Sequence, residues 1–140
     1  MPSHPKTFRN INALRDLPTY RLPAAGWVSI LHRISGALMF VLLPFFIWMF
    51  DRSVTSELSY EALTAALTHG VGVLPGALIK LVVLALLWAF LHHLLAGVRH
   101  VFMDITHSVT KGFGRASAQA TLVLSLALTV LLGAKLFGLY

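Results

Sequence analysis

Three long apolar segments, separated by polar stretches, dominate the hydrophobic pattern of this chain. They cover residues 24–50, 77–101 and 118–136. The hydrocarbon core of a bilayer is about 30 Å thick, and about 20 apolar helical residues cross it. Backbone polar groups find no water partner in lipid, so such segments are expected to be helical. The pattern therefore predicts an all-α membrane protein with three transmembrane helices.

Polar and helix-breaking residues subdivide this pattern. Pro44 lies inside the first apolar segment, where a local kink is expected. Residues 51–76 form a polar connection, and apolar side chains recur on one helical face within it. This recurrence favours a short helix at the membrane surface between the first two spans. Residues 102–117 are expected to form a second loop.

Basic residues are distributed unequally among the polar stretches. Residues 1–23 form a polar, proline-containing arm, and the chain up to Arg33 carries five Lys and Arg residues. The stretch 51–80 has two, against three acidic residues, and the stretch 99–117 has three. The excess of positive charge on cytoplasmic flanks predicts that the arm and the second loop are cytoplasmic. The first connection would then be periplasmic.

The composition agrees with a chain that faces lipid. Of the 140 residues, 57% are hydrophobic and only 11% are charged, whereas soluble domains carry about 25% charged residues. The net charge of +6 is explained by the membrane flanks, so no nucleic-acid partner is expected. Because the chain has no cysteine, it cannot hold a disulfide or a cysteine-bound iron–sulfur cluster.

Ionisable groups inside membrane segments are costly and usually functional. The first such cluster consists of Ser29, His32, Arg33 and Gly36, which share one helical face. A hydroxyl beside a guanidinium could bind the carbonyl oxygens of a quinone, on which reduction builds negative charge. In the alternative interpretation, His32 and Arg33 only reach lipid headgroups, and Ser29 bonds to its own helix.

The second cluster consists of His93, Gly97, His100 and Asp104, which also share one helical face. A neutral imidazole in lipid needs a partner, and haem iron commonly takes an axial histidine. Gly97 lies one turn from His93 and would leave space for a flat macrocycle. In the alternative interpretation, His93 is only hydrogen-bonded between helices.

Basic groups near the cytoplasmic end are candidates to neutralise the propionates of such a haem. They are His32, Arg33, Arg99 and His100. His32 is expected nearer the membrane surface than His93, and His100 lies about 10 Å from His93 on the same helix. A partner subunit is therefore expected to supply the opposite ligand. His92 projects about 100° away from His93, and a packing role is one interpretation of it.

Both clusters resemble signatures of a known family. The string SILHRISG at residues 29–36 resembles the S-x-x-H-R-x-[ST]-G signature of the succinate dehydrogenase cytochrome b subunit. The string HLLAGVRHVFMD at residues 93–104 resembles the second signature of this family, H-x-x-x-G-x-R-H-x-x-x-D. The order and separation of the strings, the three spans and the chain length also match.

The resemblance implies roles for individual residues. His93 would be an axial ligand of the iron of haem b, and Ser29 and Arg33 would contribute to a ubiquinone site. His32, Arg33 and His100 would surround the haem propionates. The opposite axial histidine would come from a second, smaller membrane anchor subunit. A flavoprotein subunit and an iron–sulfur subunit would dock on the cytoplasmic face of a bacterial inner membrane.

The resemblance also implies how the chain would act. Electrons from succinate would reach ubiquinone through iron–sulfur clusters held elsewhere, as part of the tricarboxylic acid cycle and the respiratory chain. The chain itself would contribute no catalytic residue to succinate oxidation. Alternatives are a fumarate reductase anchor, a non-redox membrane tether and a small transporter component. The last is disfavoured, because polar groups clustered at one end of the spans make a poor pathway through the membrane.

Overall fold

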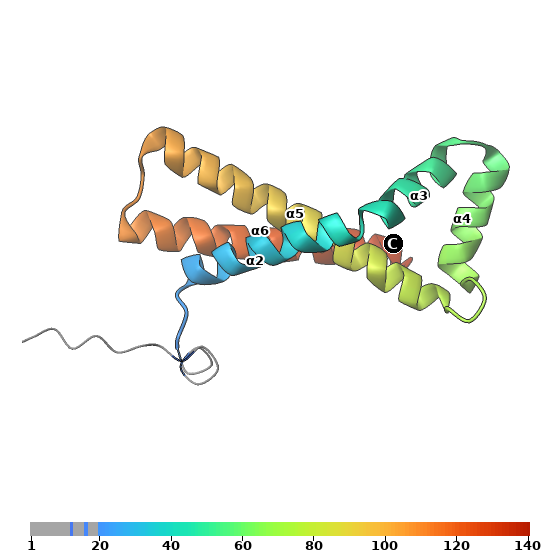
Figure 1. Ribbon diagram of the computed structural model, residues 1–140, viewed down its shortest axis with the longest axis horizontal. Helices are drawn as coiled ribbons and strands as arrows, with labels where there is room; N and C mark the ends of the chain where they lie inside the picture. Colours follow the sequence, from blue (N-terminus) through green and yellow to red (C-terminus); the bar gives the residue numbers. More distant parts are fainter. Residues whose placement is uncertain (1–11, 13–15, 17–19) are drawn as a thin grey trace, which may run out of the picture.

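The computed structural model describes residues 12, 16 and 20–140. Its five described helices are α2 (Ala24–Val41), α3 (Leu43–Val54), α4 (Glu57–His69), α5 (Gly76–Thr106) and α6 (Lys111–Leu136) (Figure 1). The described residues contain no strand beyond a single isolated bridge. The predicted all-α fold is therefore confirmed. Most of the arm predicted at residues 1–23 lies outside the described residues.

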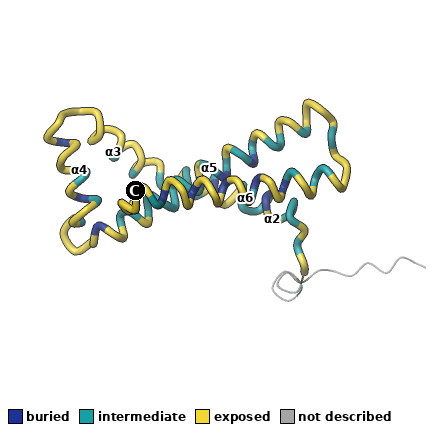
Figure 2. The backbone as a smooth tube through the Cα atoms, turned by 180° about the vertical axis from the view of Figure 1, so that it is seen from behind, coloured by how far each residue is buried: buried dark blue, intermediate teal, exposed yellow. Residues whose placement is uncertain are grey.

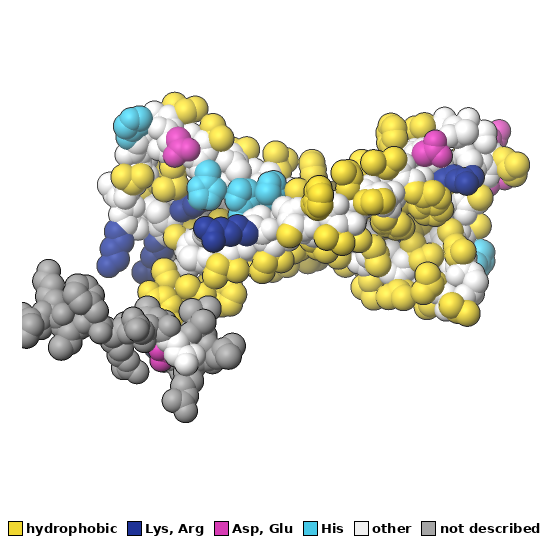
Figure 3. All heavy atoms as spheres, in the orientation of Figure 1, with side chains coloured by type: hydrophobic (Ala, Val, Ile, Leu, Met, Phe, Trp, Pro, Cys, Tyr) yellow, Lys and Arg dark blue, Asp and Glu magenta, His cyan; other side chains and the backbone are white. Residues whose placement is uncertain are grey.

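Three of these helices, α2, α5 and α6, are long and apolar enough to cross a membrane. They form an elongated bundle in which α5 packs against both α2 and α6, and α5 runs in the opposite direction to the other two (Figure 1). Most of the surface of the bundle is exposed and apolar (Figures 2 and 3). The prediction of a three-helix membrane protein is confirmed.

The first apolar segment is divided between two helices. α2 ends at Val41, and α3 begins at Leu43 with Pro44 in its first turn. Leu42 lies between them with a ψ of 2°, outside the helical range. Proline is tolerated in a first turn because its missing N–H would have no helical acceptor there. The kink expected near Pro44 is present, and α3 leads away from the bundle (Figure 1).

α3 and α4 form a hairpin beyond the end of the bundle (Figure 1). The hydroxyl of Ser56 accepts from the Ser59 N–H at 3.2 Å, and the Ser59 hydroxyl accepts from the Ser56 N–H at 3.0 Å. This reciprocal cap starts α4. α4 ends at His69, and Gly70, which follows it, has a φ of 94°, which suits glycine. The short helix expected between the first two spans is therefore α4.

The connection between α5 and α6 is shorter than the loop predicted over residues 102–117. α5 continues to Thr106, and α6 begins at Lys111. The hydroxyl of Thr110 accepts from the Phe113 N–H at 3.3 Å and caps α6. The predicted spans end where their apolar runs end. The helices continue past those points, because polar residues also form helical hydrogen bonds. With 31 residues, α5 is longer than a bilayer core requires.

Small and hydroxyl-bearing residues form the core between the spans. One cluster of fully buried apolar residues takes a member from each span, and its members are Val28, Ala96 and Ala118. A buried stripe of hydroxyl side chains follows on α6, formed by Thr121, Ser125 and Thr129. Each of these hydroxyls donates to a carbonyl of its own helix. Such residues let membrane helices approach closely, because they keep the side chains at the contact small.

Candidate functional site

Three histidines meet where α2 crosses α5. The ring of His32 on α2 lies 4.1 Å from the ring of His93 and 5.4 Å from that of His100, between centroids. His93 and His100 are about 10 Å apart along α5, so His32 lies between them. Figure 3 shows His side chains gathered beside Lys and Arg side chains on this face. The two clusters found in the sequence therefore come together, one from each helix.

One nitrogen of the His93 ring is held by α2. Nδ1 lies 3.1 Å from the backbone oxygen of His32, and a carbonyl oxygen can only accept, so Nδ1 carries the proton and donates. The hydroxyl of Ser35 donates to the same oxygen at 2.9 Å and lies 3.4 Å from Nδ1. This tautomer leaves an unprotonated lone pair on Nε2 of His93. Metal-binding histidines commonly donate their second ring N–H to a backbone carbonyl in this way.

Gly36 allows the His93 ring to pack against α2. A Cβ at this position would lie 2.9 Å from Cε1 and 3.3 Å from Nδ1 of His93. A side chain would therefore push the ring away from the carbonyl oxygen of His32. The spacing pattern placed Gly36 on the face of the first cluster but did not identify the group that approaches it.

We expect Gly36→Ala to destabilise the packing of α2 on α5 by about 1–3 kcal/mol, the usual cost of overpacking. Thermal unfolding of the purified protein in detergent measures the effect as a lower melting temperature. Gly112→Ala is the matched control, because a Cβ there meets nothing within 4 Å. Equal melting temperatures for the two variants would contradict the close contact between position 36 and the His93 ring.

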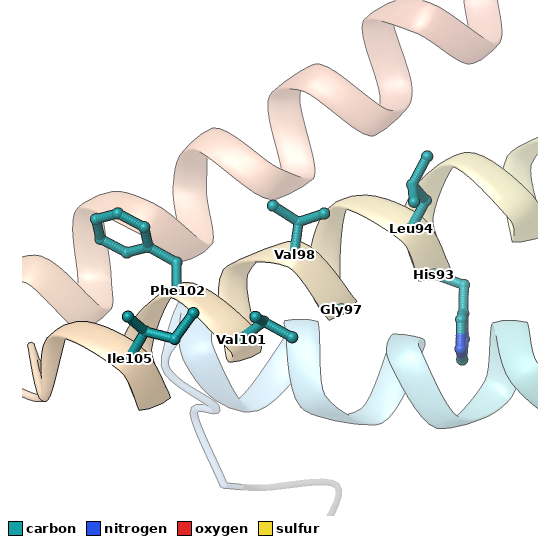
Figure 4. A pocket seen from close by; sticks show the side chains of 7 residues that line it. All are labelled: His93, Leu94, Gly97, Val98, Val101, Phe102 and Ile105. Carbon is teal, nitrogen blue, oxygen red and sulfur yellow. The ribbon is translucent and has the colours of Figure 1, made fainter.

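A groove of about 460 Å³ runs along α5 beside His93. It is lined by His93, Leu94, Gly97, Val98, Val101, Phe102 and Ile105. In Figure 4, His93 is directed toward α2, whereas Leu94 and Val98 project to the other side of α5. The lining is apolar except for His93 and lies on a single helix. Among the described helices, α5 alone therefore forms the lining of this groove.

His32, His92 and His93 differ in whether their Nε2 atoms are buried. Nε2 of His32 and Nε2 of His92 are buried and have no hydrogen-bond partner. Nε2 of His93 also makes no hydrogen bond within the described part of the chain, but it is not enclosed, and His93 lines the groove. Among these three, only His93 combines a fixed tautomer with an accessible lone pair.

Gly97 lies in the groove one turn from His93, as the sequence pattern predicted. A Cβ here would come no closer than 3.9 Å to a neighbouring atom, Nε2 of His32. The glycine is therefore not required by packing within the chain, in contrast to Gly36. Its effect is to leave the groove on α5 without a side chain one turn from His93.

His32 lies deeper than the sequence analysis expected. It was expected nearer the membrane surface than His93, but the two rings are in contact. The apolar run that set the expected depth begins after Arg33, whereas α2 begins at Ala24, which puts His32 about 12 Å into the helix. Rings 4.1 Å apart leave no gap for a macrocycle between them. In this arrangement His32 cannot face His93 across one iron.

Ser29 and Arg33 lie one turn apart on α2. Ser29 is half-buried and Arg33 is exposed. Among the residues that the structure describes, neither side chain has a hydrogen-bond or ion-pair partner, and Ser29 does not bond back to its own helix. The described part of the chain therefore engages neither polar group.

Arg99, one of the candidates to neutralise propionates, bonds to α6 and not to the three histidines. Its Nε donates to the Ser117 hydroxyl at 3.0 Å, and a terminal nitrogen donates to the Gly114 carbonyl at 3.2 Å. Arg99 thus joins α5 to α6. The physical reason is that it precedes His100 by one residue and so projects about 100° away around the helix.

His92 packs within this chain rather than at the groove. Its side chain is 0% exposed, and its Nδ1 lies 3.2 Å from the hydroxyl oxygen of Ser125 on α6. Its ring stacks on Trp88, with centroids 5.7 Å apart. The recurrence of Thr121, Ser125 and Thr129 every four residues predicts that these hydroxyls share one helical face, but it does not show that His92 meets one of them.

Comparisons with known proteins identify the family of the chain. The succinate dehydrogenase/fumarate reductase transmembrane subunit family matches residues 9–132. A Coxiella burnetii protein named succinate dehydrogenase cytochrome b556 subunit is 36% identical over 118 residues, which cover 84% of this chain and 90% of that protein. Proteins of the same name from Paracoccus denitrificans and Rickettsia felis are 31% and 28% identical; the matches cover 82% and 83% of this chain, and 83% and 85% of those proteins. Because the family match includes all three spans and both histidine clusters, the chain belongs to the succinate dehydrogenase/fumarate reductase transmembrane subunit family.

Proposed function

We propose that this membrane anchor binds haem b through His93 and forms part of the ubiquinone-reducing site of succinate dehydrogenase. The observation that carries the haem assignment is the tautomer of His93. Its Nδ1 donates to the His32 carbonyl, its Nε2 has no hydrogen-bond partner among the described residues and is not enclosed, and His93 lines an open groove. The relatives named cytochrome b556 subunits support the same assignment.

The residues around His93 fit a haem in shape and in chemistry. The apolar groove suits a flat, largely apolar macrocycle, and Gly97 removes a side chain from its floor. The buried, unpartnered Nε2 of His32 lies next to Gly97, and His100 follows on the same side. Together with Arg33, these groups would hold the propionates, since cationic donors pair well with carboxylates. When bound, haem would supply reversible one-electron transfer beside the quinone site.

The open groove supports a requirement for partner subunits. A single helix lines it, so a second small membrane anchor would cover it and supply the opposite axial histidine. The flavoprotein and iron–sulfur subunits would dock at the cytoplasmic end of a bacterial inner membrane. The basic residues of α2 and of the start of α6 support this orientation, with the N-terminal arm on the cytoplasmic side.

Ser29 and Arg33 would bind the head of ubiquinone. The Ser29 hydroxyl would donate to a quinone carbonyl, and the Arg33 guanidinium would stabilise the negative charge that builds on that oxygen. Ubiquinone takes up two electrons and two protons to become ubiquinol. The electrons would arrive from succinate through the iron–sulfur subunit, since this chain has no cysteine to hold a cluster. A fumarate reductase anchor would use the same groups in the opposite direction.

The test is a reduced-minus-oxidised optical spectrum of the intact complex, purified through a tag on this chain. We expect b-type haem bands and co-purification of the flavoprotein, the iron–sulfur subunit and a second small membrane protein. Co-purification of all partners without b-type bands would leave the anchor role intact and overturn the haem assignment. A chain that purifies without these partners would overturn the assignment to succinate dehydrogenase.

A further inference from the structure

A polar contact is enclosed between α5 and α6, away from the groove. His92 is the largest fully buried side chain in the described part of the chain, and Ser125 is 2% exposed. The hydroxyl of Ser125 donates to the Leu122 carbonyl at 3.1 Å. Its oxygen can therefore accept from the Nδ1–H of His92, which lies 3.2 Å away. The interplanar angle of 22° between His92 and Trp88 shows that the ring is also held on its face.

The contact matters because His92 directly precedes the candidate haem ligand. Consecutive helical residues project about 100° apart, so His92 reaches α6 while His93 reaches α2. Each ring is fixed through its own Nδ1, to Ser125 in one case and to the His32 carbonyl in the other. Rotation of α5 about its axis would break one or both hydrogen bonds. Inside a membrane no water replaces a lost partner, so each bond resists that rotation.

We infer that the hydrogen bond between His92 and Ser125 is a positioning device that fixes the rotation of α5 and, through it, the plane of the His93 ring. This inference rests on the proposed role of His93 as a haem ligand. The orientation of an axial imidazole affects the electronic structure of a low-spin ferric haem, because the ring plane determines its overlap with the iron orbitals. His92 and Ser125 would therefore affect the electronic structure of the haem without contacting it.

The test compares the ferric haem signal in electron paramagnetic resonance spectra of assembled complexes. We expect Ser125→Ala to retain haem but to shift or broaden the low-spin signal, because His92 loses its partner and α5 gains rotational freedom. Ser125→Thr keeps the hydroxyl and should restore the wild-type signal. Threonine already occurs at two other buried positions of the same stripe, Thr121 and Thr129.

Thr121→Val is the matched control. This hydroxyl is buried one turn from Ser125 and donates only to the Ser117 carbonyl of its own helix, so its loss should leave the haem signal unchanged. If Ser125→Ala does not assemble, His92→Phe carries the same expectation, since it keeps the ring against Trp88 but removes Nδ1.

A wild-type signal in whichever of these variants assembles would overturn the inference. Failure of both variants to assemble would also overturn it, because the pair would then be a folding requirement without a separate positioning effect. If the wild-type complex itself shows no haem signal, the proposed function fails instead. The failure of the positioning inference and the failure of the haem assignment are thus distinguishable.

Discussion

A complex that carries His93→Ala is expected to lose most of its b-type haem while this chain still enters the membrane with its partner subunits. The substitution removes the accessible lone pair at Nε2 and the hydrogen bond from Nδ1 to the His32 carbonyl. Changes to groups that only support a metal ligand typically weaken metal binding about 10–100-fold, and loss of the ligand itself should exceed that range. The ratio of haem to this chain in the purified complex measures the effect.

The matched control for this prediction is His69→Ala. His69 is an exposed histidine in the last turn of α4, outside the three-histidine cluster, and its loss should leave the haem content unchanged. Full retention of haem by the His93→Ala complex, with an unaltered optical spectrum, would show that His93 is only a packing residue between α2 and α5.

The second large effect is expected on the rate of ubiquinone reduction. Ser29→Ala and Arg33→Ala should each lower succinate-to-ubiquinone activity, while succinate oxidation by an artificial dye continues at the wild-type rate. Loss of one preorganised group that stabilises developing negative charge typically costs about 100- to 1,000-fold in rate. We expect the lower end of this range, because Arg33 is exposed and water can partly replace it. Parallel assays of both activities on the same preparation measure the difference.

The chain offers a matched control pair for these variants at its opposite end. Arg52 and Ser53 lie on α3, and the Ser53 hydroxyl donates to the Phe50 carbonyl. Arg52→Ala and Ser53→Ala should therefore leave both activities unchanged. If Ser29→Ala or Arg33→Ala lowers the dye-linked activity as much as the quinone activity, the substitution has impaired assembly, and the assignment to the quinone site is wrong.

Much of the fold could be predicted from the sequence, because a helix that crosses lipid must meet simple requirements of length and hydrophobicity. A span needs enough apolar residues and satisfies its backbone internally, so segment length alone identified the three membrane helices. Helical periodicity then grouped His93, Gly97 and His100 on one face, and the structure brings His32 against that face. The break near Pro44 followed from the chemistry of proline.

The contacts between helices could not be predicted in the same way. The periodicity of one helix fixes which residues share a face, but not how far a neighbouring helix is shifted along it. For this reason the predicted depth of His32 relative to His93 was wrong, and the bonds of Arg99 to α6 were not foreseen. The pairing of His92 with Ser125 depends on the same relative shift, between α5 and α6.

The break at Leu42 has a mechanical consequence for the whole subunit. Pro44 cannot donate a backbone hydrogen bond, so the helical ladder is weakest just where α3 leaves the bundle. A force on the α3–α4 hairpin would bend the chain at this joint before it moved α2. Bending at this joint would thus limit how much movement of α3 is passed on to α2. α4 packs against α5, so an insertion that leaves the register of the histidines intact, such as a label or a reporter peptide, belongs in the turn between α3 and α4.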